Sequence, residues 1–163
     1  MTPENIDHCK VVEELSPSIT EINYLRRTLR GHWMIPKRFC HTKGTIAHGG
    51  TISFILDTSM FLLLSALSNN EKGGLSLGLN IQFFNACKPG KVDVYSKMIK
   101  EGKNIVFGSC DLYQGDDIVA SGTQQMKVFR NSKELSFSTF FSENVTHIAV
   151  SYTHLTLPTK RIV

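Results

Sequence analysis

The chain has 163 residues, which is long enough for one domain with a sizeable core and too short for two ordinary domains. Its hydrophobic content of 41% and charged content of 20% are typical of a globular protein and argue against a disordered or fibrous chain. The net charge of +4 is small, and Lys and Arg are scattered without a nucleic-acid-binding motif, so we expect no nucleic-acid partner.

The N-terminal part gives few structural signals. We interpret residues 1–20 as a partly loose N-terminal segment, because the opening is polar and the short apolar group around Val12 runs into a turn-like Ser-Pro-Ser. The spacing of Ile22, Leu25 and Leu29 favours a helix. The apolar run at residues 33–35, just before Pro36, favours a short strand instead.

A long apolar helix is predicted from Thr51 to about Ser68, after the sequence Lys-Gly-Thr-Ile-Ala-His-Gly-Gly at residues 43–50. Large apolar side chains fall on nearly every side of this helix, so it has to be enclosed by the rest of the domain. Its apolar run at residues 52–67 contains Asp57 and three serines, and at 16 residues it is short for a membrane span. We therefore expect a buried helix and no membrane span.

Strand patterns follow this helix. Residues 75–83 alternate apolar and polar side chains, which predicts a half-buried strand. Further strands are expected at residues 91–100, 104–113 and 118–129, and the short turns between them favour an antiparallel meander. Together these elements predict an α+β fold, with one antiparallel sheet wrapped around one long buried helix in a single domain at residues 21–130.

We leave the tail at residues 131–163 out of the fold prediction, because it is rich in Ser, Thr and Phe and lacks clear periodicity. Within it, residues 151–163 resemble the translation of a sequencing adapter, and we interpret them as non-native.

The four cysteines, Cys9, Cys40, Cys87 and Cys110, form no CxxC pair and have no His at zinc-finger spacing. The N-terminal sequence also lacks the charge and apolar run of a signal peptide. We therefore expect reduced thiols in an intracellular protein, located in the cytoplasm or in mitochondria.

Asp57 is unusual because an ionised carboxylate among large apolar side chains is costly unless it is paired, solvated or neutralised. It is either a functional acid or a silent residue on a solvated stripe, hydrogen-bonded with Ser53 one turn earlier. From the residues alone, both interpretations stay open.

Gly49 and Gly50 open the helix, so their amides lie in its first turn, at the positive end of the helix dipole. Such amides can hold the negative oxygen that develops during acyl transfer, although a tight packing turn would use the same glycines. We interpret His48 as a structural hydrogen-bonding residue. The histidines show no metal-ligand spacing, so we expect no metal site.

The sequence Gly-Thr-Ile-Ala-His-Gly-Gly at residues 44–50, followed by Asp57 and then Leu-Ser-Leu-Gly-Leu-Asn-Ile at residues 75–81, resembles the PaaI-like subgroup of hotdog-fold acyl-CoA thioesterases. The similarity covers residues 42–129 and includes Lys-Glu-Gly-Lys at residues 100–103. It implies hydrolysis of acyl-CoA to free acid and CoA, with no cofactor, since CoA is part of the substrate. The implied catalytic residues are Asp57 as base or nucleophile, Gly49 as carbonyl donor and Ser76 as water-orienting residue.

The implied substrate-binding residues are His48, Gly50, Asn80, Lys100 and Lys103, with the two lysines as candidate contacts for the CoA phosphates. Many relatives carry an Asn shortly before the His-Gly-Gly sequence, whereas this chain has His41 and Thr42 there and one extra residue, Ala47. The resemblance therefore leaves the second carbonyl donor open between His41 and Thr42.

Helix geometry adds a constraint of its own. Gly49 and Asp57 are eight residues apart, or about 12 Å along a helix, so one thioester cannot contact both within one chain. If both act on the same carbonyl, the acid has to come from a second copy of the helix, which predicts a homodimer or a tetramer. Two other functions compete with hydrolysis: a non-catalytic acyl-CoA or partner-binding module, and a dehydratase or hydratase that would use His48.

Overall fold

The computed structural model describes residues 10–130 and 141–148. Within these residues, seven strands form one sheet in the order β5-β8-β7-β6-β2-β1-β9, and a two-stranded ladder joins β3 to β4. In chain order the elements are α1 (Lys10–Leu15), β1 (Ser18–Asn23), β2 (Thr28–Ile35), a 3₁₀ turn (Lys37–Phe39), β3 (Cys40–His41), β4 (Ile46–Ala47), α2 (Gly49–Leu67), β5 (Lys72–Phe83), β6 (Gly90–Glu101), β7 (Ile105–Gln114), β8 (Asp117–Arg130) and β9 (Phe141–Ile148).

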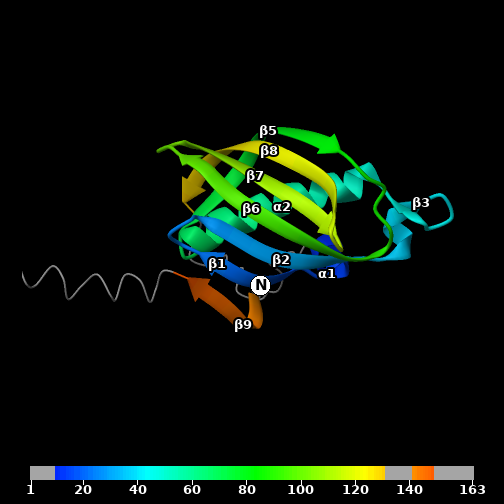
Figure 1. The fold of residues 1–163 in the computed structure, drawn as a ribbon. Helices are drawn as coiled ribbons and strands as arrows, with labels where there is room; N and C mark the ends of the chain where they lie inside the picture. The colour runs from blue at the N-terminus through cyan, green and yellow to red at the C-terminus, as the bar shows by residue number, and fades with distance from the viewer. Residues whose placement is uncertain (1–9, 131–140, 149–163) are drawn as a thin grey trace, which may run out of the picture.

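Helix α2 lies against the concave face of the curved sheet (Figure 1), and eleven of its side chains are buried there. At Gly108 on β7 a Cβ atom would lie 1.7 Å from Met60 Cε, so the end of the Met60 side chain fills the space beside this glycine. The Trp33 indole also donates a hydrogen bond of 3.0 Å to Ser59 Oγ, which joins β2 to the same helix. Helix α2 is long and apolar enough to cross a membrane by length and composition, but here it occupies the position of a core helix.

The predicted architecture, an α+β domain with a sheet around one long helix, is confirmed. Strands β6, β7 and β8 form the antiparallel meander that the turns predict. The sheet is larger than predicted at its far side, where β9 pairs in parallel with β1 and lies within the tail that the prediction leaves out. Strand β1 likewise begins inside the segment 1–20, while residues 1–9, 131–140 and 149–163 lie outside the described residues.

The helix predicted from Ile22 is wrong, because this segment is the hairpin of β1 and β2. Ile22 and Leu29 pair directly across the two strands, so both face the core without a helical repeat. Leu25 is exposed at the turn, where the Asn23 side chain accepts a hydrogen bond of 2.9 Å from the Arg26 amide. Arg27 completes the turn with a positive φ of 57°.

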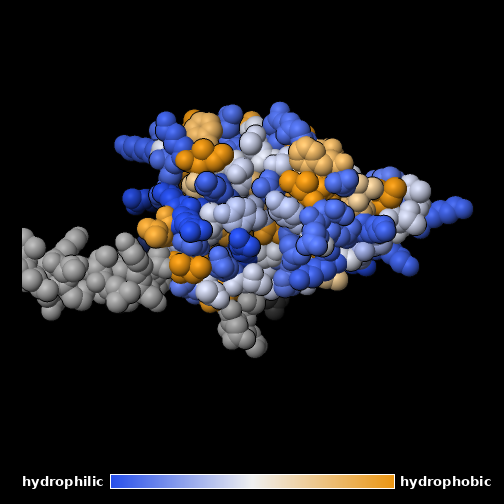
Figure 2. Space-filling view, in the orientation of Figure 1, coloured by the Kyte–Doolittle hydropathy of each residue, from blue (hydrophilic) through white to orange (hydrophobic). Residues whose placement is uncertain are grey.

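The half-buried character predicted for the strand at residues 75–83 is also wrong. The side chains of Leu75 and Leu77 are 63% and 57% exposed, and Phe83 is exposed as well. Two features explain this exposure. Strand β5 lies at an edge of the sheet, and its pairing with β8 shifts register between Ser76 and Gly78. Figure 2 shows hydrophobic patches on this side of the molecule, on a surface that is otherwise mainly hydrophilic.

Candidate active site

Asp57 lies on α2 with its side chain at the edge of the core, next to strand β5. Ser76 Oγ donates a hydrogen bond of 2.5 Å to Asp57 Oδ1, and Gln124 Nε2 donates to the same oxygen. Gln124 Nε2 also lies 2.6 Å from Ser76 Oγ. The structure thus brings together two of the three predicted catalytic residues, Asp57 and Ser76, and adds Gln124 to them.

The alternative for Asp57, a silent acid bonded with Ser53, does not match these contacts. Ser53 Oγ donates to the Gly49 carbonyl oxygen over 2.8 Å, one turn back along the helix. The carboxylate of Asp57 is instead held by side chains from two strands. This arrangement answers the physical requirement that a charge among apolar side chains needs polar partners.

Gln124 is the residue that the sequence interpretation missed. It lies on β8 and is buried, at 2% exposed. The strand pattern contains a signal that would have found it, because residues 120, 122, 124 and 126 form the buried row of β8. A polar side chain in the core-facing phase of a strand needs a polar partner, and that partner is Asp57.

The N-terminus of α2 presents the second part of the predicted site. His48 caps the helix through its backbone: its carbonyl oxygen accepts from the amides of Thr51 and Ile52, and its side chain forms no cap hydrogen bond. The amides of Gly49 and Gly50 precede the first residues that bond within the helix, so they are available to an external acceptor. A Cβ atom on Gly50 would meet nothing within 4 Å, and one on Gly49 would contact the Phe83 ring.

The position of the missing Asn lies on the β3–β4 hairpin, where Thr42, Lys43 and Gly44 all have positive φ angles. The rings of His41 and His48 lie side by side, with their centroids 5.0 Å apart. Thr42 Oγ1 lies 2.7 Å from His41 Nδ1, so it contacts the His41 ring and fixes one of its nitrogens. His41 is therefore the one of the two candidates whose side chain packs beside the N-terminal cap of α2.

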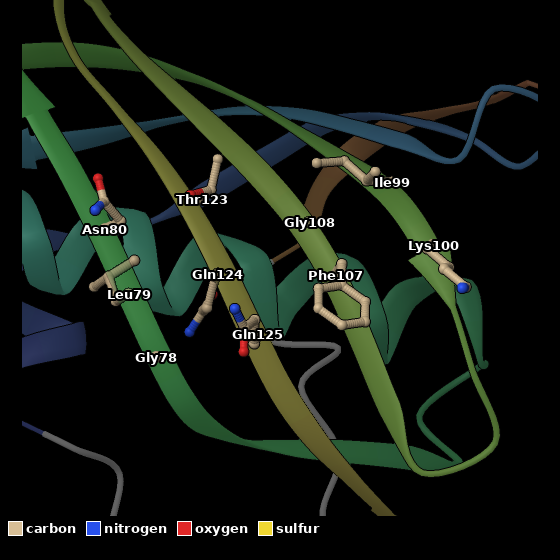
Figure 3. A pocket seen from close by; sticks show the side chains of 10 residues that line it. All are labelled: Gly78, Leu79, Asn80, Ile99, Lys100, Phe107, Gly108, Thr123, Gln124 and Gln125. Carbon is tan, nitrogen blue, oxygen red and sulfur yellow. The ribbon is translucent and has the colours of Figure 1, made fainter.

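Asn80 and Lys100, two of the predicted substrate-binding residues, line a hollow of about 580 Å³ together with Phe107 and Gln125. One row of paired residues crosses four strands from Gly78 through Gln125 and Phe107 to Lys100. Figure 3 shows α2 behind these strands, so the hollow lies on the sheet face that points away from the helix.

Gly78 lines the hollow without a side chain, and a Cβ atom there would meet nothing within 4 Å. Lys103 lies in the turn beyond Lys100, exposed and outside the residues that line the hollow. The structure therefore does not bring Asn80 and Lys100 to the same face as Asp57, and the two sets of residues meet only across the edge strand β5.

Cys87 and Cys110 are not candidate nucleophiles. Burial raises the pKa of Cys87 to about 11 and that of Cys110 to about 12, so both remain protonated at neutral pH and are poor nucleophiles. In the ranges 10–130 and 141–148, no three His, Cys, Asp or Glu side chains are grouped so that they could hold a metal ion.

Residues 44–121 match the thioesterase superfamily model. The match includes Gly49, Asp57 and Ser76 and ends before Gln124. A Pseudomonas aeruginosa protein named "Putative esterase PA0474" is 27% identical over 90 residues, which are 55% of this chain and 66% of that protein. The aligned part is thus just under two thirds of that relative.

Solved structures share the fold. Thioesterase superfamily member 2 from Mus musculus is 21% identical, with a TM-score of 0.62 over 72% of this chain and 84% of that chain. The Streptococcus mutans protein smu.793, solved bound to acetyl CoA, is 17% identical, with a TM-score of 0.61 over 72% of this chain and 91% of that chain. Together with the long sheet around α2, these likenesses show that the chain has the hotdog fold.

Proposed function

We propose that this protein hydrolyses acyl-CoA thioesters to free acid and CoA, as a member of the PaaI-like subgroup. The proposal rests on Asp57, which lies on the core helix within the segment that matches the thioesterase superfamily. Ser76 and Gln124, from two strands, both donate hydrogen bonds to its carboxylate. A carboxylate held by two donors at the edge of a core suits the activation of water or attack on a carbonyl.

In the proposed reaction Asp57 acts as base or as nucleophile. As a base, it takes a proton from a water molecule oriented by Ser76, while the water oxygen forms a new bond to the thioester carbon. The carbon–sulfur bond then breaks, and the proton passes to the CoA thiolate. The amide of Gly49 stabilises the negative oxygen that develops on the carbonyl, a contribution that is worth on the order of 10²- to 10³-fold in rate for one donor.

A second copy of the chain completes this site. Gly49 and Asp57 lie at the first and ninth residues of α2, about 12 Å apart along its axis. The position of β5 at the edge of the described sheet, with Leu75 and Leu77 exposed, supports pairing with another copy along this strand. The active species is then a homodimer, or a tetramer built from such dimers, in which each site combines Gly49 of one subunit with Asp57 of the other.

CoA is the proposed carrier of the acyl group. A neighbour in fold binds acetyl CoA, and this chain offers an outer-face hollow lined by Asn80 and Lys100, with Lys103 in the adjacent turn. We assign these two lysines to the CoA phosphates and the residues His48 and Gly50 to the acyl end of the substrate. The extra residue Ala47 is buried and donates its amide to the Cys87 carbonyl, so it serves the core rather than the substrate.

A non-catalytic acyl-CoA-binding or partner-binding module is the second candidate, because His41 and Thr42 stand where the resemblance expects an Asn. A hydratase is the third candidate; it would need His48 and an acid disposed around one substrate carbon, and measurement of thiol release separates it from hydrolysis.

Release of free thiol from a panel of saturated, unsaturated and aryl acyl-CoAs tests the proposal. We expect the purified protein to release CoA from at least one of them. Binding of acyl-CoA without thiol release from any substrate would favour the binding module, and hydration of an enoyl-CoA without thiol release would favour the hydratase.

A further inference from the structure

Gln124 belongs to the same cluster as Asp57, although it lies outside the segment that matches the thioesterase superfamily. Its Nε2 donates to Asp57 Oδ1 and contacts Ser76 Oγ at 2.6 Å, and Ser76 donates to the same Asp57 oxygen. Three side chains from α2, β5 and β8 thus meet around one carboxylate oxygen.

These contacts distinguish the two oxygens of Asp57. Oδ1 receives both donors, whereas Oδ2 forms no hydrogen bond within the part of the chain that the structure describes. A carboxylate fixed through one oxygen has a defined direction for the other. We propose that Gln124 is a positioning residue that holds Asp57 with Oδ2 directed at the reacting water or carbonyl carbon. This inference rests on the proposed hydrolysis.

The environment of Gln124 argues against a purely structural role. Its neighbours in the buried row of β8 are Ala120, Gly122 and Met126. Its Oε1 is also buried and has no hydrogen-bond partner among the described residues. Burying an amide oxygen without a partner is unfavourable, so an apolar side chain of the same length would suit the core better. The amide is useful at this position through its N–H groups.

Two substitutions separate these roles. Gln124→Met keeps the length of the side chain and removes the N–H donors. Gln124→His keeps an N–H donor, but on an imidazole ring in place of the amide. We expect Gln124→Met to lower kcat roughly 10- to 100-fold, as misplacement of a reacting group does. KM should change little. Tm should change by no more than a few degrees, because Asp57 loses one of its two donors while the buried amide oxygen without a partner is also removed. Gln124→His should recover part of the lost kcat.

Two controls accompany them. Ser65 lies on α2, the helix that carries Asp57. Like Gln124, it has a buried side-chain oxygen without a partner among residues 10–130 and 141–148. Ser65→Ala should therefore leave kcat unchanged, which shows that loss of a buried polar group in this core is not enough to reduce turnover. In a chain that already carries Asp57→Asn, Gln124→Met should lower the residual kcat no further, since Gln124 acts through Asp57.

The outcomes are distinct. If wild-type protein releases thiol, Asp57→Asn does not, and Gln124→Met retains full kcat, the hydrolysis stands and the role of Gln124 is wrong. A fall of several degrees in Tm with equal loss of kcat in the Met and His variants would instead make Gln124 structural. If wild-type protein itself releases no thiol from any acyl-CoA, the proposed function fails, and this inference fails with it.

Discussion

Ser76 Oγ donates a 2.5 Å hydrogen bond to Asp57 Oδ1, which joins the exposed edge strand β5 to the core helix α2. The two residues are 19 positions apart and come from elements of opposite character: one is buried by the sheet and the other forms its edge. A site at this junction is open to a ligand that approaches the sheet edge, while its acid is fixed from within the core.

Ser76→Ala should lower kcat by roughly tenfold, less than loss of the acid itself, because orienting a water contributes less than activating it. Gln124 would still hold Asp57 in the variant. Steady-state thiol release measures the effect, with Ser109→Ala on the outward face of β7 as the control. Unchanged kcat in Ser76→Ala would make Ser76 a hydrogen-bond partner of Asp57 with no part in turnover.

Replacing both Lys100 and Lys103 by Ala should raise KM for acyl-CoA at low ionic strength with little change in kcat. Charges at an exposed hairpin act on phosphates over about 10 Å at 0.1 M salt and over less at higher salt, so the difference in KM should shrink as salt is added. Lys91→Ala, at the other end of strand β6, is the matched control. If KM at low salt is the same as in wild type, the CoA phosphates bind elsewhere.

The sequence predicted the parts of this fold that have a strong local pattern. Helix α2 combines length with apolar side chains on all sides, and strands β6 to β8 alternate between clear turns. The hairpin at Ile22 and Leu29 was missed because two strand residues that pair across a turn imitate helical spacing. The prediction that Leu75 and Leu77 lie on a half-buried strand was wrong. The edge position of β5 depends on which strands become its neighbours, and this is not a local property of the sequence.

In the site, too, the residues with a local sequence signal were predicted and the residue that depends on the tertiary fold was missed. Asp57 stood out as an acid in an apolar helix, and Ser76 came from the family resemblance. Gln124 belongs to no motif that the sequence shows. Its role depends on strand β8 lying beside β5, which brings Gln124 to Ser76 although the two residues are 48 positions apart in the chain. The separation of Gly49 from Asp57 was predictable, since helix geometry fixes it.

Glu101→Gln should lower Tm at neutral pH. Side-chain hydrogen bonds from Lys72 and Arg27 hold the pKa of the Glu101 carboxyl below its usual value. A depressed pKa in the folded state stabilises the fold above the ordinary pKa of Glu, about 4.3, and this stabilisation is lost as the pH falls through the folded value. The difference in Tm between wild type and variant should therefore be largest near pH 7 and should diminish below about pH 4. Thermal melts across this range test it, and a difference that does not depend on pH would contradict the ionic role.

Mixing two inactive variants should restore activity if the site is shared between subunits. Gly49→Val disturbs the carbonyl donor, and its new side chain meets the ring of Phe83 rather than backbone, so the fold should survive. Asp57→Asn removes the acid. With random pairing of equal amounts, half of the dimers are mixed and each has one intact site, so about a quarter of wild-type activity should return after co-refolding. Demonstrated subunit exchange without recovery of activity would place the whole site within one chain.

The proposed hydrolysis depends above all on Asp57 as the residue that activates the group attacking the thioester. Thiol release by Asp57→Asn, compared with wild type on the same acyl-CoA, tests it most directly, because Asn keeps the side-chain volume and an oxygen that can accept from Ser76 and Gln124. We expect kcat to fall roughly 10²- to 10⁴-fold, as for loss of a general base, while the Kd for acyl-CoA and the Tm stay close to their wild-type values. A well-folded Asp57→Asn variant that keeps most of the wild-type kcat would contradict the catalytic role of Asp57.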